Sequence, residues 1–373
     1  MSVSTVSAAR RTLPQPSVQD QFEEAVNYGH LDLATELLEF AGAQINDQSA
    51  WNQSTPLIRE LRGQSREEVV AFLLDNGARV DLADNGGETP LHVAAEHFNT
   101  RMVRLLLKYN PPINAQDNKG QTPLHLTVRN YNDDTMNLLV EGGGANINLP
   151  DKEGTTPLGY CCSWGRYDRA KYFFDKGADV NPTTEKDCGP FYGALYRCKK
   201  EEFPFDQLAL DMIPKLNDVN RPNCFGDCYL HLCVGRHKFD LNGPGLDRTP
   251  HINALLEKTA DVNCQDRRGY TPLHLAVQGR KEDLLPIFIA AKADINKPSQ
   301  GGLTPVQTAA RDGSEGIVRY LLENHAIVPE DAQKAFDGGD FEIAISHIKK
   351  SIPIPKSPAK TLDKEDLRYF VMA

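Results

Sequence analysis

The sequence predicts an all-α solenoid, in which similar helix pairs stack in a row and tight-turn fingers join each pair to the next. A TPLH string or a near variant recurs at spacings of 34, 33, 34, 33, 39, 43 and 33 residues, at Thr55, Thr89, Thr122, Thr156, Gly189, Cys228, Thr271 and Thr304. A second signal, of the form GADVN, follows most of these anchors by about 25 residues. Between the two signals lies an apolar pattern of helical period, such as MVRLLL at 102–107. A fixed period of this length is the signature of a stacked-repeat architecture.

Length and composition exclude several other classes of protein. The chain has 373 residues, of which 40% are hydrophobic and 25% charged, and these values are ordinary for a folded protein. It contains no apolar run long enough to cross a membrane and no apolar secretory segment near its start. Eight cysteines are too few for a disulfide scaffold, so we expect a cytoplasmic protein, with the nucleus as a second compartment. The net charge of -10 argues against general nucleic-acid binding.

Each unit can be justified residue by residue. The turn before an anchor reads DNKG at 117–120 or DKEG at 151–154, where Asp bonds nearby backbone and Gly permits a positive φ. The anchor Thr is expected to cap the following helix, and Pro occupies its first position, where no N–H is needed. Leu and small residues then face inward, and a second helix ends at the Gly of the GAD signal. One such pair cannot bury its apolar face alone, so neighbouring pairs must stack.

Together, the TPLH anchors and the GADVN signals resemble the ankyrin repeat family, and the resemblance covers residues 19–350. We expect a disordered N-terminal tail at 1–18, an N-terminal cap at 19–47, eight anchored units over about 48–329 and a C-terminal cap at 330–350. A Pro/Lys linker and short tail occupy 351–373. Two wide spacings place insertions near 199–206 and 236–248, which are either drift in tolerant surface loops or contacts for a particular partner.

The cysteines raise the question of a metal. Cys224, Cys228, His231 and Cys233 read C-x3-C-x2-H-x-C, but Cys228 occupies the Thr position of the anchor and His231 its His position. Residues 228 and 233 should diverge on a helix, whereas zinc needs converging ligands. We therefore predict no metal and no cofactor. The anchor histidines are expected to bridge the turns of neighbouring units, and no catalytic motif is present, so we expect no enzyme.

The resemblance also implies where a partner protein binds: on the hairpin tips and the exposed side of the inner helices, which together form a concave surface. At these positions the candidate partner-binding residues are Arg129, Trp164, Tyr196, Arg197, Arg236, Arg267, Arg268, Tyr270 and Arg311. Since Trp, Tyr and Arg often dominate interface energy, they suggest binding of an acidic or acidic-aromatic peptide. The competing interpretation makes the cations solubility residues and Trp164 a half-buried packing residue.

Two asparagines resemble sites of asparaginyl hydroxylation in this family. Asn114 and Asn263 each have Leu eight residues earlier, at Leu106 and Leu255. The function that the resemblance implies is a non-catalytic intracellular scaffold or adaptor without membrane insertion. One alternative is the substrate-recognition subunit of a ubiquitin ligase, although 351–373 is not similar to a SOCS box. Another is a stoichiometric inhibitor or regulator of an enzyme or transcription factor.

Overall fold

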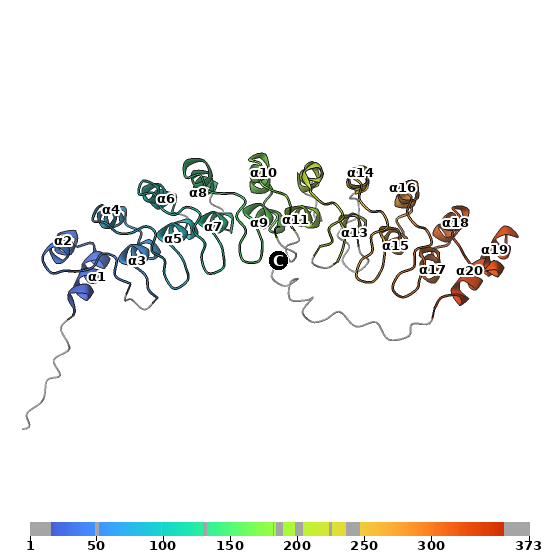
Figure 1. The fold of residues 1–373 in the computed structure, drawn as a ribbon, viewed down its shortest axis with the longest axis horizontal. Coiled ribbons are helices and arrows are strands. Elements are labelled where there is room, and N and C mark those ends of the chain that lie inside the picture. Colours follow the sequence, from blue (N-terminus) through green and yellow to red (C-terminus); the bar gives the residue numbers. More distant parts are fainter. Residues whose placement is uncertain are drawn as a thin grey trace, which may run out of the picture. The chain divides into compact units, whose positions relative to one another are not determined.

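The computed structural model describes residues 16–48, 52–97, 99–129, 133–181, 183, 189–197, 204–223, 226–235 and 247–353. All the regular elements in these ranges are helical, which confirms the predicted all-α class. None of the described helices combines the length and the apolar character that crossing a membrane requires. The chain divides into two compact units, Met1–Asn146 and Ile147–Ala373. Figure 1 shows short helices arranged as successive pairs within each unit.

The first unit contains eight α-helices in its described part and ends in a π-helical turn. These are α1 (Val18–Tyr28), α2 (Leu31–Glu39), α3 (Pro56–Arg62), α4 (Glu67–Asp75), α5 (Pro90–Glu96), α6 (Thr100–Leu107), α7 (Pro123–Arg129), α8 (Asp133–Asn137) and the turn η1 (Leu138–Gly142). The odd-numbered α3, α5 and α7 pack side by side, and we call them inner helices. The helices α4, α6 and α8 form a second row, the outer helices (Figure 1).

The second unit repeats the same arrangement and ends in a cap. Its described elements are α9 (Pro157–Ser163), α10 (Tyr167–Asp175), α11 (Gly189–Arg197), α12 (Pro204–Met212), η2 (Ile213–Lys215), α13 (Tyr229–Val234), α14 (Thr249–Glu257), α15 (Pro272–Gln278), η3 (Glu282–Leu284), α16 (Leu285–Ala290), α17 (Pro305–Arg311), α18 (Glu315–Glu323), α19 (Glu330–Asp337) and α20 (Phe341–Lys350). Each inner helix from α9 to α17 contacts the next inner helix. Unit 2 is therefore a continuous stack of helix pairs.

The anchor residues start the inner helices in the way the sequence predicts. Thr271 is the N-cap of α15, where its side chain accepts the N–H of His274, and Pro272 occupies the first helical turn. Thr304 and Pro305 do the same for α17. Because the Thr oxygen satisfies an otherwise unpaired N–H, these seven-residue helices begin at a defined position.

The fingers that precede the inner helices are built on buried aspartates. Asp117 is 7% exposed, and its Oδ1 accepts the backbone N–H groups of Lys119 and Gln121, both at 2.8 Å. Gly120 has a φ of +79°, a left-handed conformation that glycine adopts without strain. Asp151 makes the equivalent bonds in its own finger. The Asp–Gly turn signal in the sequence therefore corresponds to a rigid finger.

Two kinds of side chain join successive helix pairs. The anchor histidines are buried, and His92 Nε2 donates to the carbonyl of Gln121 in the next finger at 3.0 Å, as His274 does to Leu303. This confirms the predicted bridging role of the histidines. In addition, an Asn at the end of most units accepts a backbone N–H from the following unit through Oδ1, whereas the unit anchored at Thr55 has Asp81 at this position. The seven asparagines that do so are Asn46, Asn114, Asn148, Asn181, Asn220, Asn263 and Asn296.

Both ends of the array carry modified helix pairs. The first helix, α1, begins with a capping box between Ser17 and Asp20. Its first residue, Val18, lies one position before the start predicted for the N-terminal cap. At the other end, Gln307 of α17 occupies the anchor His position, and its Nε2 donates to the carbonyl of Ser351 at 3.2 Å. Residues 351–353, which follow α20, therefore take the place of a further finger. The rest of the predicted tails, 1–15 and 354–373, lies outside the described residues.

The two predicted insertions fall mostly outside the described residues, but their edges are visible. Residues 204–206 begin α12, and residues 247–248 precede α14. The Arg248 guanidinium is buried and donates to Asp206 Oδ1 at 2.9 Å and to the Leu195 carbonyl at 3.0 Å. This ion pair fixes the start of α14 against α12 and α11, so the helix pairs stay stacked where the spacing of the anchors is irregular.

Candidate functional site

The finger formed by residues 266–270 carries two of the predicted partner-binding arginines. Asp266 is buried, and its Oδ1 accepts the backbone N–H groups of Arg268 and Tyr270 at 2.8 and 2.9 Å. This turn leaves the Arg267 and Arg268 side chains exposed. Among the described residues, none forms an ion pair or side-chain hydrogen bond with the Arg268 guanidinium. The Arg268 charge is therefore available to a binding partner.

Contacts with the adjacent fingers hold this finger in place. The Arg268 carbonyl accepts the backbone N–H of Gln300, in the following finger, at 2.9 Å. On the other side, Arg267 lies over Gly226 of the preceding finger, where an added Cβ would be only 2.6 Å from Arg267 Cγ. Gly226 also has a φ of +80°. A glycine at this position thus leaves room for the Arg267 side chain to cross the finger.

Tyr270, the last residue of the same finger, and Arg311, at the end of the inner helix α17, extend this surface. Tyr270 is half-buried, and its ring centroid lies 5.5 Å from that of His274. Arg311 is exposed at the end of α17, and its Nε donates to Asp312 Oδ1 at 3.0 Å. The hydrogen bond to Asp312 raises the pKa of Arg311, and Tyr270 adds to this shift. Arg267, Arg268 and Tyr270 therefore share one finger, and Arg311 lies at the end of the next inner helix, where Asp312 offsets part of its charge.

The other predicted partner-binding residues are placed differently. Trp164 is the C-cap of α9 and is half-buried, with its ring edge-on to Tyr160 at 4.9 Å between centroids. Arg129 is exposed at the end of α7, in the first unit. Tyr196 and Arg197 lie in the last turn of α11, but their side chains are outside the described residues, as is all of Arg236. Binding of a partner by any of these residues stays a prediction.

The two predicted modification sites belong to the series of asparagines between units. Asn114 Oδ1 accepts the N–H of Asn146 at 2.8 Å. Asn263 Oδ1 accepts the N–H of Asp294 at 2.7 Å, and its Nδ2 lies 3.5 Å from the Lys292 carbonyl. Both side chains thus have a structural role. Hydroxylation of Asn114 and Asn263 stays a prediction.

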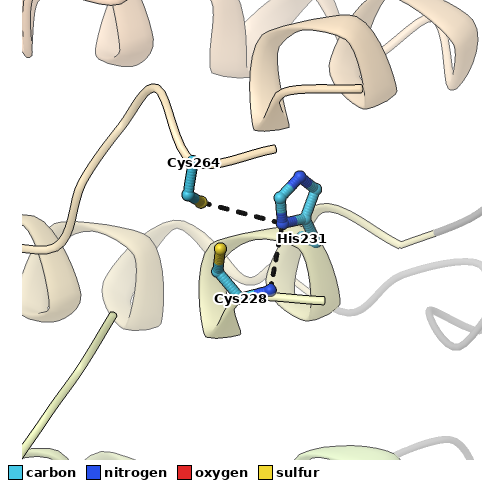
Figure 2. A group of neighbouring side chains, drawn as sticks. All are labelled: Cys228, His231 and Cys264. Carbon is cyan, nitrogen blue, oxygen red and sulfur yellow. Dashed lines mark hydrogen bonds between the residues drawn. The ribbon is translucent and has the colours of Figure 1, made fainter. Parts of the chain in front are cut away.

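A second group of chemically active side chains lies between α13 and the loop that follows α14. Figure 2 shows Cys228, His231 and Cys264, whose ligand-type atoms all lie within 4.8 Å of one another. Cys228 and His231 are buried, and Cys264 is half-buried. The ring atom His231 Nδ1 accepts the backbone N–H of Cys228 at 3.2 Å and lies 3.7 Å from Cys264 Sγ. The other ring nitrogen, Nε2, donates to the Tyr270 carbonyl at 2.8 Å.

These three groups alter one another's acidity. The hydrogen bond from the Cys264 thiol, and after it the interaction with His231, lowers the pKa of Cys228 to about 6 despite its burial. Because Cys264 donates this bond, the pKa of its own thiol is raised. Burial alone would lower the pKa of His231, but the hydrogen bond and the charge of Cys228 outweigh burial and raise it. Cys228 is therefore the thiol of this cluster that ionises more readily.

The C-x3-C-x2-H-x-C pattern in the sequence contains Cys224, Cys228, His231 and Cys233, but it does not contain Cys264. Cys233 is fully buried on α13 and does not belong to the cluster, as its helical spacing from residue 228 predicts. Cys224 lies outside the described residues. Cys264 comes from the start of the next unit, 33 residues after His231, whereas Ala115 follows His92 by 23 residues, because the insertion near 236–248 lengthens this unit. Alignment of the repeats could have revealed Cys264, because it occupies the position that Ala115 has before the Gln–Asp pair of an earlier unit.

Comparison with known proteins identifies the family from which these units come. The family model for ankyrin repeats, in three copies, matches residues 22–117, 99–184 and 246–331, which is more than half of the chain. The chain is an ankyrin-repeat protein. The ankyrin-repeat resemblance seen in the sequence is thereby confirmed. Ankyrin repeats are protein–protein interaction modules that bind through the extended surface of the stack, and as a family they are generally non-catalytic.

Curated proteins with similar sequences contain ankyrin-type segments within much longer chains. Alpha-latroinsectotoxin-Lt1a of Latrodectus tredecimguttatus is 28% identical over 267 residues, which cover 70% of this chain and 18% of the toxin. Neurogenic locus notch homolog protein 1 of Homo sapiens is 30% identical over 141 residues, covering 38% of this chain and 5% of that protein. The protein of the same name from Danio rerio is 32% identical over 180 residues, covering 46% and 7%. The ankyrin-repeat chain thus spans less than a fifth of the length of these relatives.

Proposed function

We propose that this ankyrin-repeat protein is a non-catalytic scaffold or adaptor inside the cell, which binds an acidic segment of a partner protein. The observation that carries the proposal is the exposed Arg267–Arg268 pair on a finger that its neighbours hold in place. Arginine guanidinium groups bind carboxylates in a bidentate manner, and their presentation on a rigid turn reduces the entropy lost on binding. Tyr270 and Arg311 lie on the adjoining surface and supply an aromatic ring and a further cation.

The test reverses the charge of both arginines. We expect R267E/R268E to weaken binding of the captured partner at least about tenfold, which corresponds to about 1.4 kcal/mol. Partners captured by the wild-type protein from cell extract are identified by mass spectrometry, and their dissociation constants for both proteins are then measured at two salt concentrations. Loss of affinity should be greater at low salt, because the interaction is electrostatic.

A matched control separates the finger from general effects of charge. Lys349 and Lys350 are also adjacent, exposed cations of the second unit, at the end of α20. The variant K349E/K350E changes the net charge by the same amount and should bind partners as the wild type does. Equal binding by R267E/R268E and the wild type would exclude the finger as the binding surface.

The same captured complexes distinguish the proposed adaptor from its two alternatives. An adaptor should bring two or more different proteins into one complex. A substrate-recognition subunit should co-purify with ubiquitin-ligase components and shorten the lifetime of its partner. An inhibitor should form a stoichiometric complex with one enzyme or transcription factor and abolish its activity. Cell fractionation with a specific antibody tests the proposed cytoplasmic location, with the nucleus as an additional compartment.

A further inference from the structure

Cys228 replaces the hydroxyl that normally caps an anchor histidine in this chain. In three other units a Thr Oγ1 lies 2.9 Å from the His Nδ1, at Thr89–His92, Thr122–His125 and Thr271–His274. In the unit of α13 the same position holds a sulfur atom. The backbone bond of the cap is retained, because the Cys228 N–H donates to His231 Nδ1 at 3.2 Å, as the Thr89 N–H does to His92 at 3.1 Å.

A second substitution, in the next unit, supplies another sulfur to the same ring atom. Cys264 occupies the position of Ala115, and its Sγ lies 3.7 Å from His231 Nδ1. Figure 2 shows the two cysteines approaching the ring from different segments, Cys228 from the start of α13 and Cys264 from the following loop. Two sulfurs and one imidazole nitrogen therefore converge between two successive helix pairs, within 4.8 Å of one another.

This donor set and its spacing suit zinc. Thiolate and imidazole are the ligands that Zn²⁺ prefers, with Zn–S near 2.3 Å and Zn–N near 2.0–2.1 Å. Two such ligands at a tetrahedral angle are about 3.6 Å apart, close to the observed 3.7 Å between Cys264 Sγ and His231 Nδ1. The bond from His231 Nε2 to the Tyr270 carbonyl fixes the tautomer that leaves Nδ1 free of a proton. Metal-binding histidines are commonly oriented by a backbone carbonyl in this way.

We propose that Cys228, His231 and Cys264 bind one Zn²⁺ ion, which joins two successive helix pairs next to the Arg267–Arg268 finger. Three protein ligands leave the fourth tetrahedral position to solvent, which half-buried Cys264 allows to approach. The ion takes the Nδ1 lone pair from the Cys228 N–H, so part of the binding energy is offset by the loss of that cap hydrogen bond. The proposal is independent of what the finger binds.

The experiment uses the full chain, reduced with a phosphine and stripped of metal by a chelator. Titration with Zn²⁺ alone, measured by isothermal titration calorimetry, should show one tight site per chain. Titration with Co²⁺ should produce sulfur-to-cobalt charge-transfer absorption, which reports thiolate ligands directly. Binding should also raise the temperature of unfolding, because the ion binds the folded state only.

The chain itself offers variants that should fold. C228T restores the residue found at Thr271, and C264A restores the residue found at Ala115. Each should weaken Zn²⁺ binding at least about tenfold and reduce the charge-transfer band, because one of the two thiolates is lost. C233A is the matched control, because it removes a cysteine from the same helix and restores the residue found at Ala94 and Ala276. It should bind zinc as the wild type does.

Three results would overturn the zinc site. The first is absence of stoichiometric Zn²⁺ binding by the reduced wild-type chain. The second is unchanged binding by C228T and C264A, which would place the metal on other cysteines. The third is a Cys228–Cys264 disulfide in protein prepared without reductant, combined with no metal uptake after its reduction. That result would identify the pair as a redox couple.

Discussion

At the scale of single residues, the anchor histidine shows how one buried polar side chain links two units. His92 is fully buried, with Nδ1 bonded to the cap of its own helix and Nε2 bonded to the Gln121 carbonyl of the next finger. Burial lowers the pKa of His92, and the Gln121 carbonyl and the nearby carboxylates of Asp117 and Glu88 offset this only in part. The folded chain therefore holds a neutral imidazole.

A pH-dependent loss of stability follows. The unfolded chain has a His92 pKa near 6.5, above that of the folded chain, so it binds more protons at acid pH. The free energy of unfolding should fall as pH decreases below about 6.5, by at most about 1.4 kcal/mol per pH unit from this residue. H92Q should make that slope shallower. Urea unfolding at several values between about pH 5 and pH 7 measures it.

The control for this prediction is present in the sequence. Gln307 occupies the same position in the last unit, where its Oε1 accepts the Thr304 N–H at 3.0 Å and its Nε2 donates to Ser351. Glutamine can therefore make both bonds without titrating, so H92Q should lose little stability at neutral pH. An unchanged slope in H92Q would assign the acid sensitivity to other groups.

At the scale of the elements, the asparagines between units make a contribution that can be measured locally. Asn263 accepts the Asp294 N–H at 2.7 Å, across the boundary between two helix pairs. We expect N263A to cost about 1 kcal/mol, the typical net value of one hydrogen bond. Hydrogen exchange at the Asp294 amide should become faster, because that N–H loses its acceptor.

The comparison variant for Asn263 is N324A. Asn324 Nδ2 donates to the Tyr320 carbonyl within its own helix region and joins no further unit. N324A should therefore leave exchange at Asp294 unchanged. If both variants or neither changed that exchange rate, the Asn263 bond would not be what protects the amide.

The helices and fingers could be predicted because their signals are local. Thr271 and Pro272 start α15, and the Asp–Gly turn before them forms the finger, all within a few residues. Contacts between units could not be predicted in the same way. Cys264 belongs to the unit that follows that of His231, and Arg248 reaches Asp206 and Leu195 across an irregular spacing. Which side chains meet there depends on how neighbouring pairs stack, and a single unit does not specify this.

At the scale of the whole molecule, the C-terminal end of the described stack is closed by contacts of residues 351–353 with the last inner helix and the last finger. The carbonyl and hydroxyl of Ser351 accept the Gln307 amide at 3.2 and 3.1 Å. Pro353 lies over Gly302 in the last finger, 3.2 Å from where a Cβ would be. Residues 351–353, predicted as the start of a linker, are thus part of the folded end.

Two truncations test this assignment. A chain that ends at Pro353 keeps these contacts and is the reference. One that ends at Lys350 should be less stable by about 1–2 kcal/mol, because Gln307 loses its acceptors. Thermal unfolding measures both, and Q307A in the full chain should reproduce much of the loss. Equal stability of the two truncated chains would show that 351–353 contributes nothing.

The asparagine bonds also give the stack a direction. In each of these seven bonds the earlier unit contributes the side chain, and the later unit contributes only backbone groups. The receiving positions consequently vary in chemistry while the contributing residue is always Asn: they are Arg79, Asn146, Asp179, Asn217, Asp261, Asp294 and Ile327. The two ends of the array are therefore not interchangeable, and substitutions are tolerated unequally on the two sides of each boundary.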